Sequence, residues 1–135
     1  MPLSRCRKHN EGKKMSNVIN WFEIPVQDLQ RATAFYEHCI DAQFRQEHVA
    51  GMSMAVFHYQ EPAIGGALVK SEALQPSANG TVVYLYTADI AASLKKVAEK
   101  GGTCCFGPEI LPDDIGTIAL IIDSEGNKVG LHQPA

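Results

Sequence analysis

The stretch NVINWFEIPVQDLQRATAFYEHC, residues 17–39, decides how the chain begins to fold. Residues 17–26 are rich in β-branched and aromatic side chains, which is typical of a strand, and Pro25 marks its edge or its end. Asp28 follows as a helix N-cap, and apolar side chains then recur at helical spacing. We therefore predict a strand followed by a helix over residues 28–40.

This strand and helix begin an order of predicted elements that occurs twice along the chain. Short strands are predicted next, at residues 44–48, 53–59 and 64–71, and residues 73–80 have the composition of a linker. The order then restarts with a strand at residues 81–87 and a helix that Asp89 caps and Gly101-Gly102 ends. Three further strands are predicted at residues 103–106, 116–122 and 128–132. The two helix caps, Asp28 and Asp89, lie 61 residues apart. Residues 123–127 are predicted to form a hairpin turn between the last two strands.

Two βαβββ modules, at about residues 17–71 and 80–133, predict an α+β fold. The helix of each module covers one sheet face and leaves the other bare. We expect the bare faces to curl into a shared cup with the helices on the outside, since small ligands usually bind in concave sites of this kind.

Composition limits what the chain can be. It has 135 residues, 45% of them hydrophobic and 20% charged, enough for one domain with a real core. Residues 1–14 hold five basic side chains and one acid, and we predict a disordered basic tail there before a single domain at 15–135. A basic arm for nucleic acid or membrane is the alternative. The net charge of −3 argues against nucleic acid as the main partner.

The cysteines and the apolar segments of the sequence indicate the cellular compartment that we expect for the protein. The four cysteines show no C-x-x-C spacing, and we interpret them as reduced, buried, small hydrophobic residues. No apolar run approaches the roughly 20 residues of a membrane span, and no secretory h-region is present. We expect a cytoplasmic protein without a membrane partner.

The module order, together with several segments, resembles the vicinal oxygen chelate superfamily, which includes glyoxalase I, extradiol dioxygenases and bleomycin-resistance proteins. The match is closest to its small glyoxalase-like branch, and the segments that carry it are IPVQDLQRATAFY (24–36), IGGALV (64–69), VYLYTAD (83–89), KGG (100–102) and DSEGNKVGL (123–131). The resemblance also implies a homodimer.

Metal-dependent members of that superfamily hold their ion with four His or Glu ligands, two from each module. The resemblance puts these positions at Trp21, at Gly65 or Gly66, at Val82 (Val83 in a shifted register), and at Gly130. None of these side chains can coordinate a cation, because indole nitrogen only donates and the others carry no donor atom. We therefore expect neither a metal nor a cofactor.

Alternation along strands suggests what lines the cup instead. If Trp21 faces inward, so do Glu23, Tyr84, Tyr86 and His132, and the candidate ligand-binding residues are Trp21, Glu23, His58, Tyr84, Tyr86 and His132. Such a set suits an aromatic or cationic ligand, with Glu23 as counter-charge. The plainer interpretation stays open: Trp21 and the tyrosines as packing residues, Glu23 paired with Arg31, Arg45 or a tyrosine hydroxyl, and His132 as a structural histidine.

The leading hypothesis is a metal-free protein that binds a small organic molecule, similar to the drug-sequestering members of the superfamily. A second is a lyase- or isomerase-type enzyme in which Glu23 or His132 is the acid or base, since a desolvated carboxylate suits proton transfer. A third is a displaced metal site of His58, Glu23 and His132, and a fourth is an interaction module acting as a homodimer. Whether the chain turns over a substrate stays open.

Overall fold

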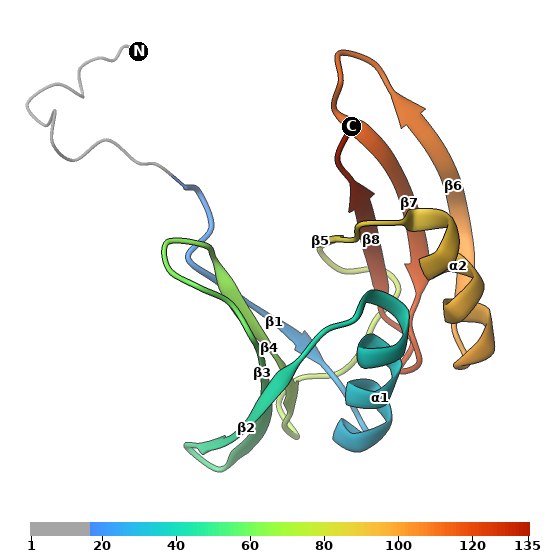
Figure 1. Ribbon diagram of the computed structural model, residues 1–135. Helices are drawn as coiled ribbons and strands as arrows, with labels where there is room; N and C mark the ends of the chain where they lie inside the picture. Colours follow the sequence, from blue (N-terminus) through green and yellow to red (C-terminus); the bar gives the residue numbers. More distant parts are fainter. Residues whose placement is uncertain (1–16) are drawn as a thin grey trace, which may run out of the picture.

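The computed structural model describes residues 17–135, so the predicted tail at 1–14 lies outside the described residues. The chain forms two four-stranded sheets and two helices, in the order βαβββ and again βαβββ (Figure 1). The predicted α+β fold of two modules is confirmed, although the two sheets do not close on each other.

Each module has the same strand order. The first contains β1 (Trp21–Pro25), α1 (Leu29–Ile40), β2 (Phe44–Val49), β3 (Met52–Phe57) and β4 (Gly65–Lys70), with sheet order β1-β4-β3-β2. The second contains β5 (Tyr84–Tyr86), α2 (Ile90–Glu99), β6 (Thr103–Leu111), β7 (Gly116–Ile122) and β8 (Lys128–Gln133), with order β5-β8-β7-β6. In both, the first strand pairs in parallel with the last, and the other pairs are antiparallel.

Both helices begin where the sequence predicts. The Asp28 carboxylate accepts a hydrogen bond from the Arg31 N–H at 3.0 Å, and Asp89 accepts one from the Ala92 N–H at 3.1 Å. These bonds satisfy backbone donors that the first helical turn leaves free.

The main difference from the predicted elements is β6, which continues past residue 106. Residue 106 is followed by Gly107-Pro108, a pair that breaks regular strands. Two irregularities in the pairing with β7, between Cys104 and Phe106 and between Phe106 and Glu109, accommodate the pair, and β6 runs on to Leu111.

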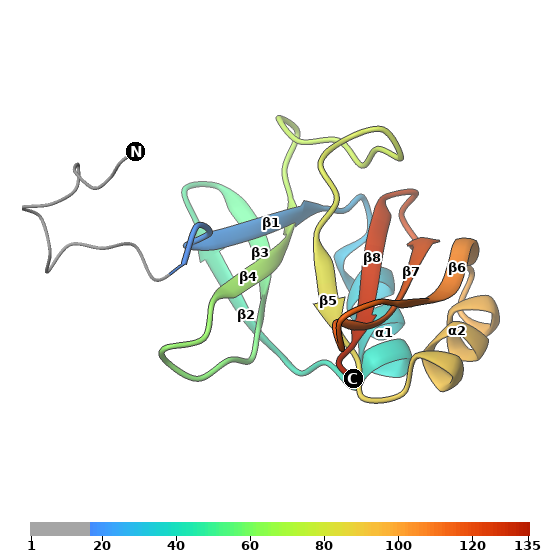
Figure 2. The ribbon, with the colours of Figure 1, turned by 90° about the horizontal axis from the view of Figure 1, so that it is seen from above.

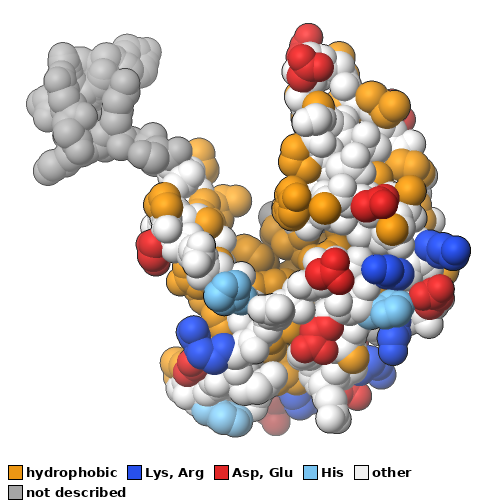
Figure 3. All heavy atoms as spheres, viewed as in Figure 1, with side chains coloured by type: hydrophobic (Ala, Val, Ile, Leu, Met, Phe, Trp, Pro, Cys, Tyr) orange, Lys and Arg blue, Asp and Glu red, His pale blue; other side chains and the backbone are white. Residues whose placement is uncertain are grey.

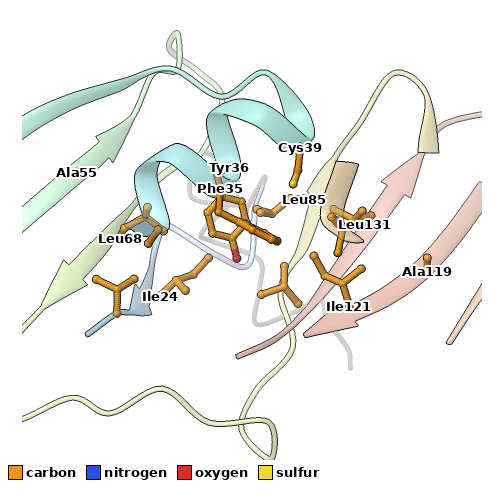
Figure 4. Close-up of a cluster of buried hydrophobic side chains, with 14 of the residues drawn as sticks. Ile24, Phe35, Tyr36, Cys39, Ala55, Leu68, Leu85, Ala119, Ile121 and Leu131 are labelled. Atoms are coloured by element: carbon orange, nitrogen blue, oxygen red, sulfur yellow. The ribbon is translucent and has the colours of Figure 1, made fainter. Parts of the chain in front are cut away.

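The core belongs to both modules. Phe35 and Tyr36 of α1 are each 1% exposed and pack in one cluster with Leu68 from the first sheet and Leu85 and Leu131 from the second (Figure 4). The modules therefore share one hydrophobic core, and α1 lies at its centre.

The expectation that the cysteines are buried is wrong for two of them. Cys39 lies in the shared core, and its burial raises the pKa of its thiol to about 12. Cys104 and Cys105 are exposed, because β6 is an edge strand and eight of its nine residues face solvent.

The sheets diverge above the core. Seen from above, β5 is the strand of the second sheet nearest to the first sheet (Figure 2). The space-filling view shows the molecule hollowed between the two sheets, with hydrophobic side chains along the walls (Figure 3). Within residues 17–135, neither helix is long and apolar enough to cross a membrane.

Candidate functional site

A hollow of about 380 Å³ lies between the modules. The first module contributes Phe22, Phe57, His58 and Tyr59 to its walls, and β5 with its flanking residues contributes Tyr84 and Tyr86. Its volume falls within the range of small-molecule sites, and its lining is mainly apolar and aromatic, as is usual for such sites.

Glycine makes the floor of this hollow possible. A Cβ added at Gly66 of β4 would overlap the ring of Phe22 on the neighbouring strand β1. The Phe22 ring therefore lies flat over the sheet, with its centre 5.6 Å from that of Phe57. The Phe57 ring in turn packs 4.6 Å from that of Phe44, which lies outside the hollow, so the two rings of the floor belong to a longer row of packed aromatic rings.

The structure gathers half of the predicted ligand-binding set at this hollow. His58, Tyr84 and Tyr86 line it. Trp21 and Glu23 alternate with Phe22 along β1 and so point to the other face of the sheet. The prediction that Trp21 and Glu23 line the ligand site assumes that Trp21 faces it, whereas the hollow borders the Phe22 face of β1.

Trp21 and Glu23 contact each other instead. The Trp21 indole Nε1 donates to Glu23 Oε2 at 3.4 Å, and its ring meets Tyr59 edge to face at 6.2 Å. Neither arginine considered for Glu23 pairs with it among the described residues, because Arg31 binds Glu125 and Arg45 binds Glu47. Glu23 lines a separate hollow of about 50 Å³.

His132 has a structural contact. Its Nε2 lies 2.6 Å from the carbonyl oxygen of Ile115, in the turn that leads into β7. Glu23 and His132, the alternative acid or base residues of the enzyme hypothesis, line no described hollow together.

The four positions that a superfamily metal would use do not fit one. Trp21 pairs with Gly65 across β1 and β4, and Gly130 pairs with Tyr84 across β5 and β8. A Cβ at Gly65 would overlap the Tyr59 ring, and one at Gly130 would overlap the Tyr84 ring. Aromatic rings thus occupy the space that a ligating side chain needs. Within residues 17–135, no three His, Cys, Asp or Glu side chains are grouped to hold a metal, so His58, Glu23 and His132 form no displaced site.

A second cluster, which the sequence interpretation missed, joins the modules at the turn of residues 123–127. The Tyr36 hydroxyl donates to Asp123 Oδ2 at 2.6 Å, and Asn127 Nδ2 donates to the Pro25 carbonyl at 2.8 Å. Backbone N–H groups of Glu125 and Asn127 donate to Asp123 Oδ1 at 2.9 Å each. The turn is therefore tied to both β1 and α1.

Glu125 completes this junction, which we call the 123–127 latch. Its carboxylate accepts hydrogen bonds from the backbone N–H groups of Gln27 and Asp28 at 2.9 Å and from Arg31 Nε at 2.7 Å. Burial raises the pKa of Glu125, but these hydrogen bonds outweigh it and lower the pKa to about 2. The segment D-S-E-G-N reads as a turn, and nothing local in it shows that its acids face a helix N-terminus 94 residues away along the chain.

Comparison with known proteins gives one family and one fold. Residues 18–131 match the model described as the glyoxalase/bleomycin resistance protein/dioxygenase superfamily. A search of the curated proteins finds no match.

Solved structures with the same fold include glyoxalase I from Zea mays, with a TM-score of 0.65, 24% identity, and coverage of 84% of this chain and 45% of the maize chain. The chain thus spans less than half the length of that enzyme. Two others are an antibiotic binding protein, TnmS3, from Streptomyces (TM-score 0.62, 22% identity, coverage 90% and 100%) and a glyoxalase/bleomycin resistance protein from Albidiferax ferrireducens (0.65, 18%, 88% and 100%).

Proposed function

The chain belongs to the glyoxalase/bleomycin resistance protein/dioxygenase superfamily, and from that premise we propose that it binds a small aromatic organic molecule, without a metal, in the hollow between its modules. One observation carries the proposal: both modules line the hollow with aromatic rings, namely Phe22, Phe57, Tyr84 and Tyr86. Aromatic walls favour flat ligands, because offset and edge-to-face ring contacts add to the burial of apolar surface.

The charged residues near the hollow indicate which charge its ligand carries. Among the described residues that line it there is no Asp, Glu, Lys or Arg. Glu23, the counter-charge expected for a cationic ligand, faces a different hollow. A neutral aromatic body is therefore the ligand that the walls match. The named relative from Streptomyces is an antibiotic binding protein, which is a precedent for binding of an organic molecule on this fold.

Fluorescence titration with the neutral dye N-phenylnaphthylamine tests the proposal. Tyr86 is 66% exposed at the mouth of the hollow, so Tyr86→Ala removes one wall with little cost to folding. We expect the variant to bind the dye about fivefold less tightly, the worth of one aromatic contact. Val49→Ala is the matched control, because Val49 is 50% exposed on β2 and lies outside the hollow.

Equal affinity of the wild type and Tyr86→Ala would contradict this location for the site. Absence of dye binding by the wild type, with no thermal shift in a panel of aromatic compounds, would contradict the function itself.

We also propose that the protein acts as a homodimer. Exposed apolar side chains support this, since Phe106 and Ile110 of β6 are 45% and 83% exposed in a strand that bears a single charge. Light scattering is expected to give the mass of two chains, and Ile110→Glu is expected to give the mass of one. A wild-type mass of one chain would contradict the proposal.

A further inference from the structure

A second hollow, which we call the side hollow, lies beside the hollow between the modules, where the start of β2 pairs with the end of β3. Its volume is about 390 Å³, and Phe57, His58 and Tyr59 line both hollows. The main-chain N–H of His58 donates to the Gln43 carbonyl at 2.7 Å, which holds the two strand ends together there. A ligand in the hollow between the modules can therefore extend past the shared residues into the side hollow.

The side hollow differs from the hollow between the modules in its polar groups. Among the described residues, no Asp, Glu, Lys or Arg lines the hollow between the modules. The side hollow is lined by Gln43, Arg45 and Glu61, whose side chains carry an amide, a guanidinium and a carboxylate. These groups supply both hydrogen-bond donors and hydrogen-bond acceptors. The aromatic part of a ligand thus matches the first hollow, and a polar substituent matches the side hollow.

Two of these three side chains are available to a ligand. Arg45 is engaged, since its Nε donates to Glu47 Oε2 at 2.6 Å. Within residues 17–135, no contact of this kind occupies the side chain of Gln43 or Glu61, and both residues are exposed. The substituent therefore meets an uncharged amide and a carboxylate.

This pair of groups favours a neutral substituent that carries hydroxyls. A hydroxyl both donates and accepts, so it can donate to Glu61 and accept from the Gln43 amide. A hydrogen bond to an ionised acceptor is also stronger than one between neutral groups. Glu61 repels an anion. A cation gains little, because water screens a single exposed ion pair and Arg45 lines the same hollow.

We propose that the aromatic ligand carries a neutral, hydroxyl-rich substituent, such as a sugar joined through a glycosidic bond, and that Gln43 and Glu61 bind this substituent in the side hollow. The inference rests on the proposed function and adds the chemical class of the ligand and the residues that recognise its polar part. The aromatic part stays in the hollow between the modules.

Three compounds with the same naphthalene body test this. Methoxynaphthalene is neutral and has no hydroxyl, naphthyl glucoside is neutral and carries a sugar, and naphthyloxyethylamine is positively charged at pH 7. Each is titrated into the full chain as a competitor of bound N-phenylnaphthylamine. We expect the glucoside to bind about tenfold more tightly than methoxynaphthalene, which is the net gain from about two hydrogen bonds. The amine is expected to bind less tightly than the glucoside.

Variants assign the gain to the side hollow. Gln43→Ala and Glu61→Ala are each expected to lower the ratio of glucoside affinity to methoxynaphthalene affinity about threefold, because each removes one hydrogen-bonding partner. Gln46→Ala and Glu72→Ala are the matched controls, because both residues are exposed and line neither of the two hollows. The controls are expected to keep the wild-type ratio. Circular dichroism checks that each variant is folded.

The outcomes separate the inference from the proposed function. The inference is overturned, and the proposed function stands, if methoxynaphthalene displaces the dye but the glucoside binds no more tightly than methoxynaphthalene does. The same follows if the amine binds as tightly as the glucoside, or if the wild-type ratio persists in both Gln43→Ala and Glu61→Ala. If N-phenylnaphthylamine does not bind at all, the proposed function fails and the inference fails with it.

Discussion

The last hairpin of each module has the same place in the fold but a different role. In the first module the connection between β3 and β4, residues 58–64, supplies His58 and Tyr59 to the hollow. In the second module the connection between β7 and β8 is the 123–127 latch, whose polar side chains bind β1 and α1. One hairpin holds the modules together, and this leaves the other free to form a site.

The two sheets also differ on the faces that their helices leave uncovered. The face of the first sheet turned away from α1 has a small core of its own, formed by Met54, Val56, Ala67 and Val69. The matching side of the second sheet carries Tyr84 and Tyr86, which are 47% and 66% exposed. A repeated topology thus leaves each copy free to diverge on the face that its helix does not cover.

The largest expected effect comes from breaking the latch at Asp123. Asp123→Ala leaves the buried Tyr36 hydroxyl and two backbone N–H groups without their acceptor. We expect the free energy of unfolding to fall by about 3 kcal/mol, measured by urea denaturation.

The control for this prediction is Glu61→Ala in the equivalent hairpin of the first module, where Glu61 is exposed. Its effect is expected to stay within about 0.5 kcal/mol. Equal losses in the two variants would mean that the hairpins do not differ in role.

Glu125→Gln is expected to have the next largest effect and to depend on pH. The pKa of Glu125 in the folded protein is about 2, below the ordinary value of about 4.3. The carboxylate therefore stabilises the fold fully above about pH 4.3, and this contribution is lost as the pH falls toward about 2. We expect a loss of about 2 kcal/mol at pH 7 and a much smaller gap between variant and wild type near pH 2. A gap that stays constant down to that pH would show that the charge of Glu125 is not what matters.

Smaller losses of stability are expected when the packing of an aromatic ring is disturbed, and the loss should differ between the two sheets. Gly66→Ala forces Phe22 away from Phe57 in a packed row, and we expect a loss of about 1.5 kcal/mol. Gly130→Ala displaces the half-exposed Tyr84 ring, which can turn toward solvent, and we expect less than about 1 kcal/mol. Thermal unfolding of the two variants measures both values. The reverse ranking would mean that the second sheet holds its ring more firmly than the first.

The smallest perturbation is chemical labelling, which needs no substitution. Iodoacetamide is expected to modify Cys104 and Cys105 in the folded protein, because β6 is exposed. Cys39 is expected to react only after unfolding, since burial in the shared core raises the pKa of its thiol to about 12. Peptide mass mapping distinguishes the three sites, and rapid labelling of Cys39 would show that the shared core opens readily.

Much of the fold was predictable because its signals are local. The caps Asp28 and Asp89, the helical spacing of apolar side chains after them, and the glycines after α2 each act within a few residues. The end of β6 was not predictable, because its irregular pairing depends on β7. The exposure of Cys104 and Cys105 was missed for a similar reason, since a strand's place at a sheet edge follows from the order of all four strands.

The candidate site was predictable only in part. Residue types alone establish that no side chain at the superfamily's metal positions can ligate. Alternation along a strand likewise establishes that Phe22 and its neighbours Trp21 and Glu23 point to opposite faces of β1. Which of those faces borders the hollow follows from long-range packing, because the shared core and the 123–127 latch set the position of the second module.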